Sequence, residues 1–135
     1  LMAQIMKVHD ATAICAPTPS QYAALAALDL DPAWLHTTKQ ALEKRRSLCC
    51  QRLDALADFF SYVPPQGAFY VLAKSLFTSE NSQEVAMRAL REARVITIPG
   101  GCCGAGGEGH LRLSFGGEEE EINMSFDRLA KWLKG

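Results

Sequence analysis

The chain has 135 residues, of which 48% are apolar, and its 14 basic and 15 acidic residues leave a formal net charge of -1. This length and apolar content predict a single compact core. The balanced charge provides no field that would gather nucleic acid or an anionic membrane surface, and no apolar run is long enough to cross a bilayer. Nucleic-acid binding and membrane association are therefore excluded from the expected functions.

Five cysteines are present, and four of them form the adjacent pairs Cys49-Cys50 and Cys102-Cys103. Neighbouring residues are poorly placed to bridge each other, so reduced thiols in a cytoplasmic protein are the expected state. The first ten residues carry no signal-peptide pattern. Because the chain opens on Leu1 and reads at once as an amphipathic helix, we expect it to be a segment of a longer protein.

The first third of the chain is predicted to be two short helices joined by a connector. Residues 1–9 have the apolar spacing of a helix, and residues 11–19 read as extended because two prolines stiffen the backbone. Ser20 is the expected N-cap of a short helix that ends at Leu28.

Asp31-Pro32 predicts the start of a long helix, because aspartate accepts free N–H groups and proline is tolerated in the first turn. An apolar stripe follows the helical period and comprises Leu35, Leu42, Cys49, Leu53, Leu56 and Phe60. The remaining surface is basic and is expected to be a solvated face, formed by Lys39, Lys44, Arg45, Arg46 and Arg52.

Two apolar strands are predicted at residues 59–63 and 68–72, separated by a turn that is rich in proline and glycine. Asn81 and Glu84 form a plausible capping pair for a helix through Arg91.

A further strand is predicted at residues 95–98, followed by a glycine-rich loop over residues 100–109. Residues 110–115 alternate, which sends Leu111, Leu113 and Phe115 to one face of a strand and His110, Arg112 and Ser114 to the other. A final helix has acidic residues in its first turn and lysines in its last. The pattern predicts an α/β fold of two layers (α+β), in which helices pack on a small, mostly antiparallel sheet.

Arg112 is the candidate binding residue. A guanidinium presents parallel N–H donors that match a carboxylate, and a strand holds its direction better than a loop. The alternative is an ordinary arginine on the polar face of a sheet. The adjacent glycine loop favours a mobile lid over a phosphate cradle, because a strand follows it instead of a helix. Cys102-Cys103 beside His110 lacks the second ligand pair of a zinc site, so no metal is predicted.

Four ordered stretches resemble class I/II aminotransferases of fold type I. Residues 7–28 resemble the segment that follows the cofactor-lysine region, and residues 65–70 the small-domain strand Pro-Gln-Gly-Ala-Phe-Tyr. Residues 95–100 resemble the strand before the mobile loop, and residues 107–115, Gly-Glu-Gly-His-Leu-Arg-Leu-Ser-Phe, the arginine-bearing strand.

The resemblance implies a pyridoxal 5'-phosphate enzyme in which a large domain holds the cofactor and a small domain closes over the substrate. Residues 1–30 then lead from a large domain outside this chain, and residues 31–135 form the C-terminal small domain. Arg112 would grip the substrate carboxylate, and Thr18 would approach the cofactor site of a neighbouring subunit in a homodimer. The implied partners are an amino acid, such as aspartate, alanine or an aromatic one, and a 2-oxo acid.

The chain departs from the family in two respects. The Ser-Lys cofactor motif is absent, so no catalytic lysine is assigned and the chain alone is expected to be inactive. Cys102-Cys103 stands where relatives often carry a small residue and a phenylalanine. Two alternatives stay open, namely another reaction of fold type I enzymes, such as that of a lyase or synthase, and a non-catalytic ligand-binding or interaction module.

Overall fold

The computed structural model describes every residue from Leu1 to Gly135. The chain divides into two compact units, Leu1–His36 and Thr37–Gly135. None of its helices combines the length and the apolar character that a membrane span requires.

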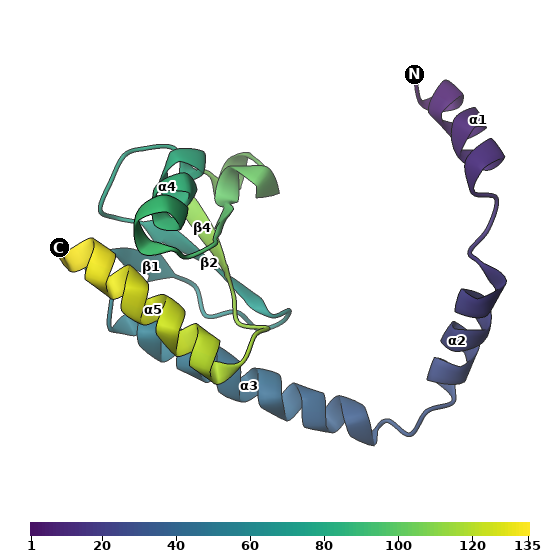
Figure 1. The fold of residues 1–135 in the computed structure, drawn as a ribbon, viewed down its shortest axis with the longest axis horizontal. Coiled ribbons are helices and arrows are strands. Elements are labelled where there is room, and N and C mark those ends of the chain that lie inside the picture. The colour runs from purple at the N-terminus through teal and green to yellow at the C-terminus, as the bar shows by residue number, and fades with distance from the viewer. The chain divides into compact units, whose positions relative to one another are not determined.

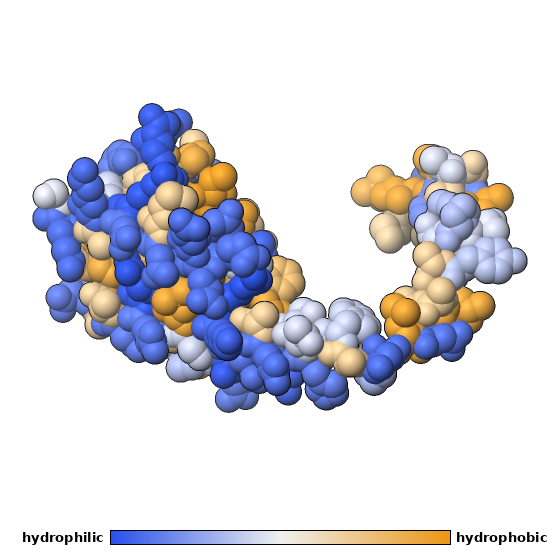
Figure 2. Space-filling view, turned by 60° about the horizontal axis from the view of Figure 1, so that its bottom comes forward, coloured by the Kyte–Doolittle hydropathy of each residue, from blue (hydrophilic) through white to orange (hydrophobic).

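The Leu1–His36 unit is helical and lacks a core of its own. It consists of α1 (Met2–Thr12), α2 (Thr18–Leu28) and the start of α3 (Ala33–Asp54). Neither α1 nor α2 contains a buried residue, and Figure 2 shows apolar side chains on the surface of this unit. These helices therefore gain no stability from burial of their apolar side chains within the unit.

The N-cap expected at Ser20 is wrong, because α2 begins at Thr18 and Pro17 is its N-cap residue. Pro19 falls in the first turn, where its missing N–H would have no helical partner and its fixed φ suits the helix. The same property explains why Pro17 and Pro19 do not make the whole connector extended. The start expected for the long helix is confirmed, since Oδ1 of Asp31 accepts the backbone N–H of Ala33 at 2.9 Å.

The Thr37–Gly135 unit contains the sheet. After α3 the elements are β1 (Phe60–Tyr62), β2 (Tyr70–Ser75), α4 (Ser82–Arg88), the π-helical turn η1 (Ala89–Ala93), β3 (Ile98–Pro99), the 3₁₀ turns η2 (Gly100–Cys103) and η3 (Ala105–Gly107), β4 (His110–Ser114) and α5 (Glu119–Lys134). The strands form one sheet in the order β1-β2-β4-β3, and every neighbouring pair is antiparallel (Figure 1). This confirms the predicted α/β fold with a small antiparallel sheet.

Alternation along the strands decides which face of the sheet carries the core. On β2 and β4 the buried residues are Val71, Ala73, Leu111 and Leu113, which all belong to one face. They form a single apolar cluster with residues of the three helices, among them Leu53 of α3, Val85 of α4, and Ile122, Phe126 and Leu129 of α5. The helices therefore cover one face of the sheet, and the other face stays open.

The basic face of α3 is only partly solvated, which corrects the sequence-based expectation. Arg45 donates to the carbonyl oxygen of Gly116 at 3.2 Å and to the carboxylate of Glu118 at 2.7 Å. Arg52 pairs with Asp127 on α5. The predicted apolar stripe is buried only from Cys49 onward, and its last two members, Leu56 and Phe60, lie beyond the end of α3 at Asp54, with Phe60 in β1. Leu35, at its beginning, is 51% exposed.

Three predicted boundaries differ from the structure for local reasons. The second strand starts at Tyr70 instead of residue 68, because Ala68 has a left-handed backbone with φ of 58°. Asn81 caps α4 as predicted, accepting the N–H of Glu84 at 2.9 Å, but the helix changes to π-helical hydrogen bonding at Ala89. The strand predicted at 95–98 shrinks to Ile98–Pro99, because the N–H of Val95 is bonded to the carbonyl of Ala89.

Candidate functional site

The open face of the sheet carries the candidate site. Directly opposite residues of an antiparallel pair share a face. Arg112 on β4 lies opposite Leu72 of β2 and Ile98 of β3. Because β4 is bonded on both sides, its backbone direction is fixed by two neighbours, and Arg112 projects from the interior of the sheet instead of from an edge.

The guanidinium of Arg112 lies against an aromatic ring. Its Cζ atom is 5.0 Å from the centre of the Tyr70 ring, a cation–π distance, and the side chain is half-buried. No ion pair of the chain involves Arg112, whereas Arg45, Arg52 and Arg88 are all paired with carboxylates. The charge of Arg112 is therefore positioned by the Tyr70 ring, and its N–H donors remain available to a ligand.

The polar neighbours of Arg112 on β4 are instead held by nearby backbone groups. Nδ1 of His110 lies 2.9 Å from the carbonyl oxygen of Glu108. Oγ of Ser114 accepts the N–H of Gly116 at 3.2 Å and donates to the carbonyl of Phe69 at 3.4 Å. Of the three residues that alternation sends to this face, only Arg112 keeps an unpaired charged group.

The glycine loop uses its backbone N–H groups internally. The N–H of Gly101 donates to Oγ of Ser82 at 3.1 Å, and those of Gly104 and Gly107 donate to carbonyls within the loop. A cradle for the phosphate of a cofactor needs such groups to converge on an external anion. The amides of this loop that are described above therefore do not converge on a phosphate group.

The two ends of the glycine loop touch back to back. A Cβ atom on Gly100 would lie 2.0 Å from the carbonyl oxygen of Gly107, and one on Gly107 would lie 2.1 Å from that of Gly100. Only glycine permits this approach. This contact between the backbones of Gly100 and Gly107 closes the base of the loop and forms its closed neck.

A clasp between Glu108 and Ser82 fixes the loop to the start of α4. The carboxylate of Glu108 accepts the N–H of Ser82 at 2.6 Å, the Ser82 hydroxyl at 3.1 Å and the N–H of Gly109 at 3.0 Å. The two backbone N–H donors, Ser82 first and then Gly109, lower the pKa of the Glu108 carboxyl below its ordinary value. Sequence reasoning missed this clasp, because only the fold brings Glu108 to the residue after Asn81.

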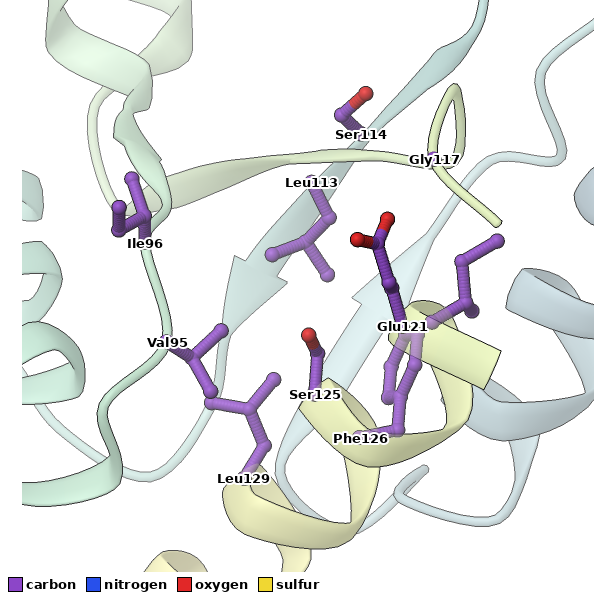
Figure 3. A pocket seen from close by; sticks show the side chains of 10 residues that line it. Val95, Ile96, Leu113, Ser114, Gly117, Glu121, Ser125, Phe126 and Leu129 are labelled. Carbon is purple, nitrogen blue, oxygen red and sulfur yellow. The ribbon is translucent and has the colours of Figure 1, made fainter. Parts of the chain in front are cut away.

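A crevice of about 240 Å³ lies between the segment before β3 and the first turns of α5 (Figure 3). Its floor is apolar, with Leu113 and Phe126, while Glu121 and Ser125 add polar groups. Arg112 does not line this crevice, and no sequence-predicted binding residue does. Ser114, on the same face of β4 as Arg112, does line the crevice, so the crevice borders the candidate site without including Arg112.

The remaining candidates lie elsewhere. Thr18 is the first residue of α2, in the Leu1–His36 unit. Cys102 and Cys103 are free and exposed at the end of η2. No group of three or more His, Cys, Asp or Glu side chains comes together in a way that suits a metal ion.

An antiparallel sheet with helices on one face and an arginine on its open face defines a two-layer α/β domain. The sequence model of the family described as aminotransferase class I and II matches residues 1–129, so the chain belongs to this family. It is 34% identical over 130 residues to aromatic-amino-acid aminotransferase 2 of Thermococcus litoralis, covering 95% of this chain and 32% of that protein. It is 31% identical to the aspartate aminotransferase of Pyrococcus abyssi, covering 99% of this chain and 34% of that protein.

Solved structures give the same assignment. The crystal structure of an aromatic aminotransferase from Pyrococcus horikoshii OT3 matches 95% of this chain and 34% of its own, with a TM-score of 0.84 and 32% identity. An alanine aminotransferase from Pyrococcus furiosus matches with a TM-score of 0.81 and 32% identity, covering 89% of this chain and 30% of its own. The chain thus spans about a third of the length of the relatives that it matches.

Proposed function

We propose that this chain is the small domain of a pyridoxal-phosphate-dependent aminotransferase, and that Arg112 binds the carboxylate of its amino acid and 2-oxo acid substrates. The observation that carries the proposal is the unpaired guanidinium of Arg112 on the open sheet face, in a chain of the aminotransferase family. A guanidinium with free N–H donors is the group that best recognises a carboxylate through two parallel hydrogen bonds.

In this proposal residues 31–135 form the small domain, and residues 1–30 lead into it. Residues outside this chain would hold most of the cofactor, and Thr18 would approach it from a neighbouring subunit. When bound, pyridoxal phosphate supplies the electron sink for chemistry at the substrate Cα. The complete protein would then be a homodimer in the cytoplasm. The five free cysteines are compatible with that compartment.

The contribution of Arg112 is orientation. The Tyr70 ring covers one side of the guanidinium, so a carboxylate would bind Arg112 from the sides that the ring leaves open. The surrounding strands hold Cα of Arg112 in place, and the clasp between Glu108 and Ser82 anchors the loop that precedes β4. The tip of that loop, residues 102–106, would serve as the lid over the bound substrate.

The substrate class follows from the relatives only as a proposal. Similar proteins are described as acting on aromatic amino acids, aspartate or alanine. All of these substrates share the α-carboxylate that Arg112 would bind, so the site in this chain does not separate them. Transfer of an amino group to a 2-oxo acid, measured on the complete enzyme, distinguishes a transaminase from a lyase or synthase of the same family.

Replacing Arg112 in the complete enzyme tests its role. Arg112→Ala is expected to lower kcat/KM for the amino acid by at least about tenfold, the usual effect of losing hydrogen bonds to a charged group. Arg112→Lys keeps the charge but loses the two-pronged geometry and should recover only part of the loss. Arg91→Ala removes an exposed arginine and is the matched control. Equal activity of Arg112→Ala and Arg91→Ala would refute the assignment.

A further inference from the structure

Cys102 and Cys103 form an exposed pair of adjacent cysteines in the proposed lid, and the proposed aminotransferase function does not use their thiol chemistry. Both lie in the single 3₁₀ turn η2, Gly100–Cys103, and both thiols are free and exposed. Gly104, which follows the turn, has φ of 108°, and a Cβ atom there or at Gly106 would meet nothing within 4 Å. The backbone that follows the pair is therefore bordered by open space, and the two cysteines are themselves accessible from solvent.

The second adjacent pair has the same sequence but a different environment. Cys49 and Cys50 lie in α3, and Cys49 is only 1% exposed. Burial, with a smaller effect of Cys50, raises the pKa of the Cys49 thiol to about 12. Because the thiolate is the reactive form, this pair cannot readily offer two sulfur ligands.

Backbone geometry favours a bridging atom over a disulfide at residues 102 and 103. Consecutive Cα atoms are about 3.8 Å apart across a trans peptide, whereas disulfides usually join Cα atoms about 4.4–6.8 Å apart. An atom inserted between the two sulfurs lengthens the bridge and removes this conflict. The pair is thus better suited to chelation than to direct oxidation.

The number of protein ligands limits which kind of atom Cys102 and Cys103 can bind. Structural zinc takes four protein ligands, but the pair supplies two. No third His, Cys, Asp or Glu side chain joins the pair in a group that could hold a metal ion, and the carboxylate nearest in sequence, that of Glu108, is bonded to Ser82 and Gly109. A soft centre that needs only two thiolates matches this pair.

We propose that Cys102 and Cys103 form a dithiol binding site for monosubstituted trivalent arsenicals. With an arsenic(III) oxide of the form R–As=O, both bonds between arsenic and oxygen are replaced by arsenic–sulfur bonds. The two thiol protons leave with the oxygen as water. Arsenic stays trivalent, so no electron is transferred and no oxidant is needed. This site does not depend on the role proposed for Arg112.

Titration of the full 135-residue chain with phenylarsine oxide tests the site, with intact-mass spectrometry as the readout. One equivalent should remain bound in excess glutathione, a monothiol, and should be released by 2,3-dimercaptopropanol, a dithiol. Cys102→Ser and Cys103→Ser should each abolish the resistance to glutathione. Cys49→Ser, from the buried pair, and Cys15→Ser, at an isolated exposed cysteine, should retain it.

A second measurement does not rely on variants. Bound arsenical should protect Cys102 and Cys103 of the unmodified chain from alkylation by iodoacetamide, as read from peptide masses, and should leave Cys15 reactive. Release of the arsenical by glutathione, or alkylation of Cys102 and Cys103 in its presence, would overturn the proposal. Retention of the arsenical by both Cys102→Ser and Cys103→Ser would overturn it as well.

Discussion

Near Arg112, individual polar side chains differ in whether the protein itself satisfies them. Glu108 accepts three hydrogen bonds from two residues, while the Arg112 guanidinium contacts only an aromatic ring among the groups described above. The bonded carboxylate of Glu108 holds the end of the glycine loop in place, whereas the unpaired guanidinium of Arg112 can bind an anionic ligand. Glu108 thus supports the structure, and Arg112, four positions later in the sequence, is available for binding.

The bonded state of Glu108 predicts a pH dependence of stability. Its folded-state pKa is lowered, so the ionised carboxylate stabilises the fold above the ordinary glutamate pKa. This contribution is lost as the pH falls through the lowered, folded-state value. Glu108→Gln should therefore be less stable than the unchanged chain at neutral pH, and the difference should shrink in acid.

Urea unfolding at neutral pH and at several pH values below the ordinary glutamate pKa measures this difference. Glu92, whose pKa is also lowered, mainly by the Trp132 indole N–H and also by Arg88, contributes equally to both proteins and cancels in the comparison. Asp58→Asn, at an exposed carboxylate, is the control. A constant difference between Glu108→Gln and the unchanged chain across the pH range would contradict the prediction.

At the scale of elements, α3 and α5 are joined by side chains as well as by the core. Leu53 of α3 and Phe126 of α5 share the apolar cluster, and Arg45 links α3 to the turn before α5 through Gly116 and Glu118. Glu118 also takes part in the capping box of α5, where its N–H donates to the Glu121 carboxylate at 3.2 Å. Arg45 therefore supports the start of α5.

Arg45→Met is expected to lower the free energy of unfolding by about 1 kcal/mol. The side chain of Arg45 is only 18% exposed, but that of Glu118 is 76% exposed. Solvent therefore partly screens the ion pair, and the expected loss of stability is small. Lys39→Met on the same helix removes a side chain that is 76% exposed and that lies 4.0 Å from the Glu43 carboxylate, so it should change stability by less than about 0.5 kcal/mol. Urea unfolding followed by tryptophan fluorescence compares the variants, and equal midpoints would contradict the expected difference.

Local patterns in the sequence predicted most of the helices and strands, whereas contacts between distant residues determine where some of them begin and end. The alternation of Leu111, Arg112 and Leu113 fixed the faces of β4, since a period of two has one solution in a half-buried sheet. The short β3 was not predictable, because it depends on a bond from Val95 to Ala89. Within the candidate site, alternation placed Arg112 on the open face of β4, but the Tyr70 ring and the Ser82 clasp required strand register and loop packing that no local pattern encodes.

At the scale of the whole molecule, the two units differ in what stabilises them. The Thr37–Gly135 unit contains every buried residue of the apolar cluster. Helices α1 and α2 have 11 residues each and bury none. Isolated helices of this length are marginal in water, because packing of an apolar face provides most helical stability in proteins.

Hydrogen exchange of the 135-residue chain should therefore divide at the boundary of the units. Backbone amides of α1 and α2 are expected to exchange within seconds at neutral pH, like those of a weakly structured peptide, and amides of β4 and α5 should be protected for far longer. Mass spectrometry of peptides from each unit measures the rates. Protection of α1 equal to that of α5 would contradict this reading. The amides of the first half of α3 provide an internal comparison, since that helix belongs to both units.

The closed neck of Gly100 and Gly107 has a consequence for evolution. Since the two backbones touch there, the residues between them form an excursion whose length does not alter the register of β4. Insertions at positions 102–106, and replacements there other than at Gly104 with its φ of 108°, are therefore expected to leave the direction of Arg112 unchanged. The two adjacent cysteines lie in this excursion, so a change of their side chains is expected to leave the pairing of β4 with β2 and β3 intact.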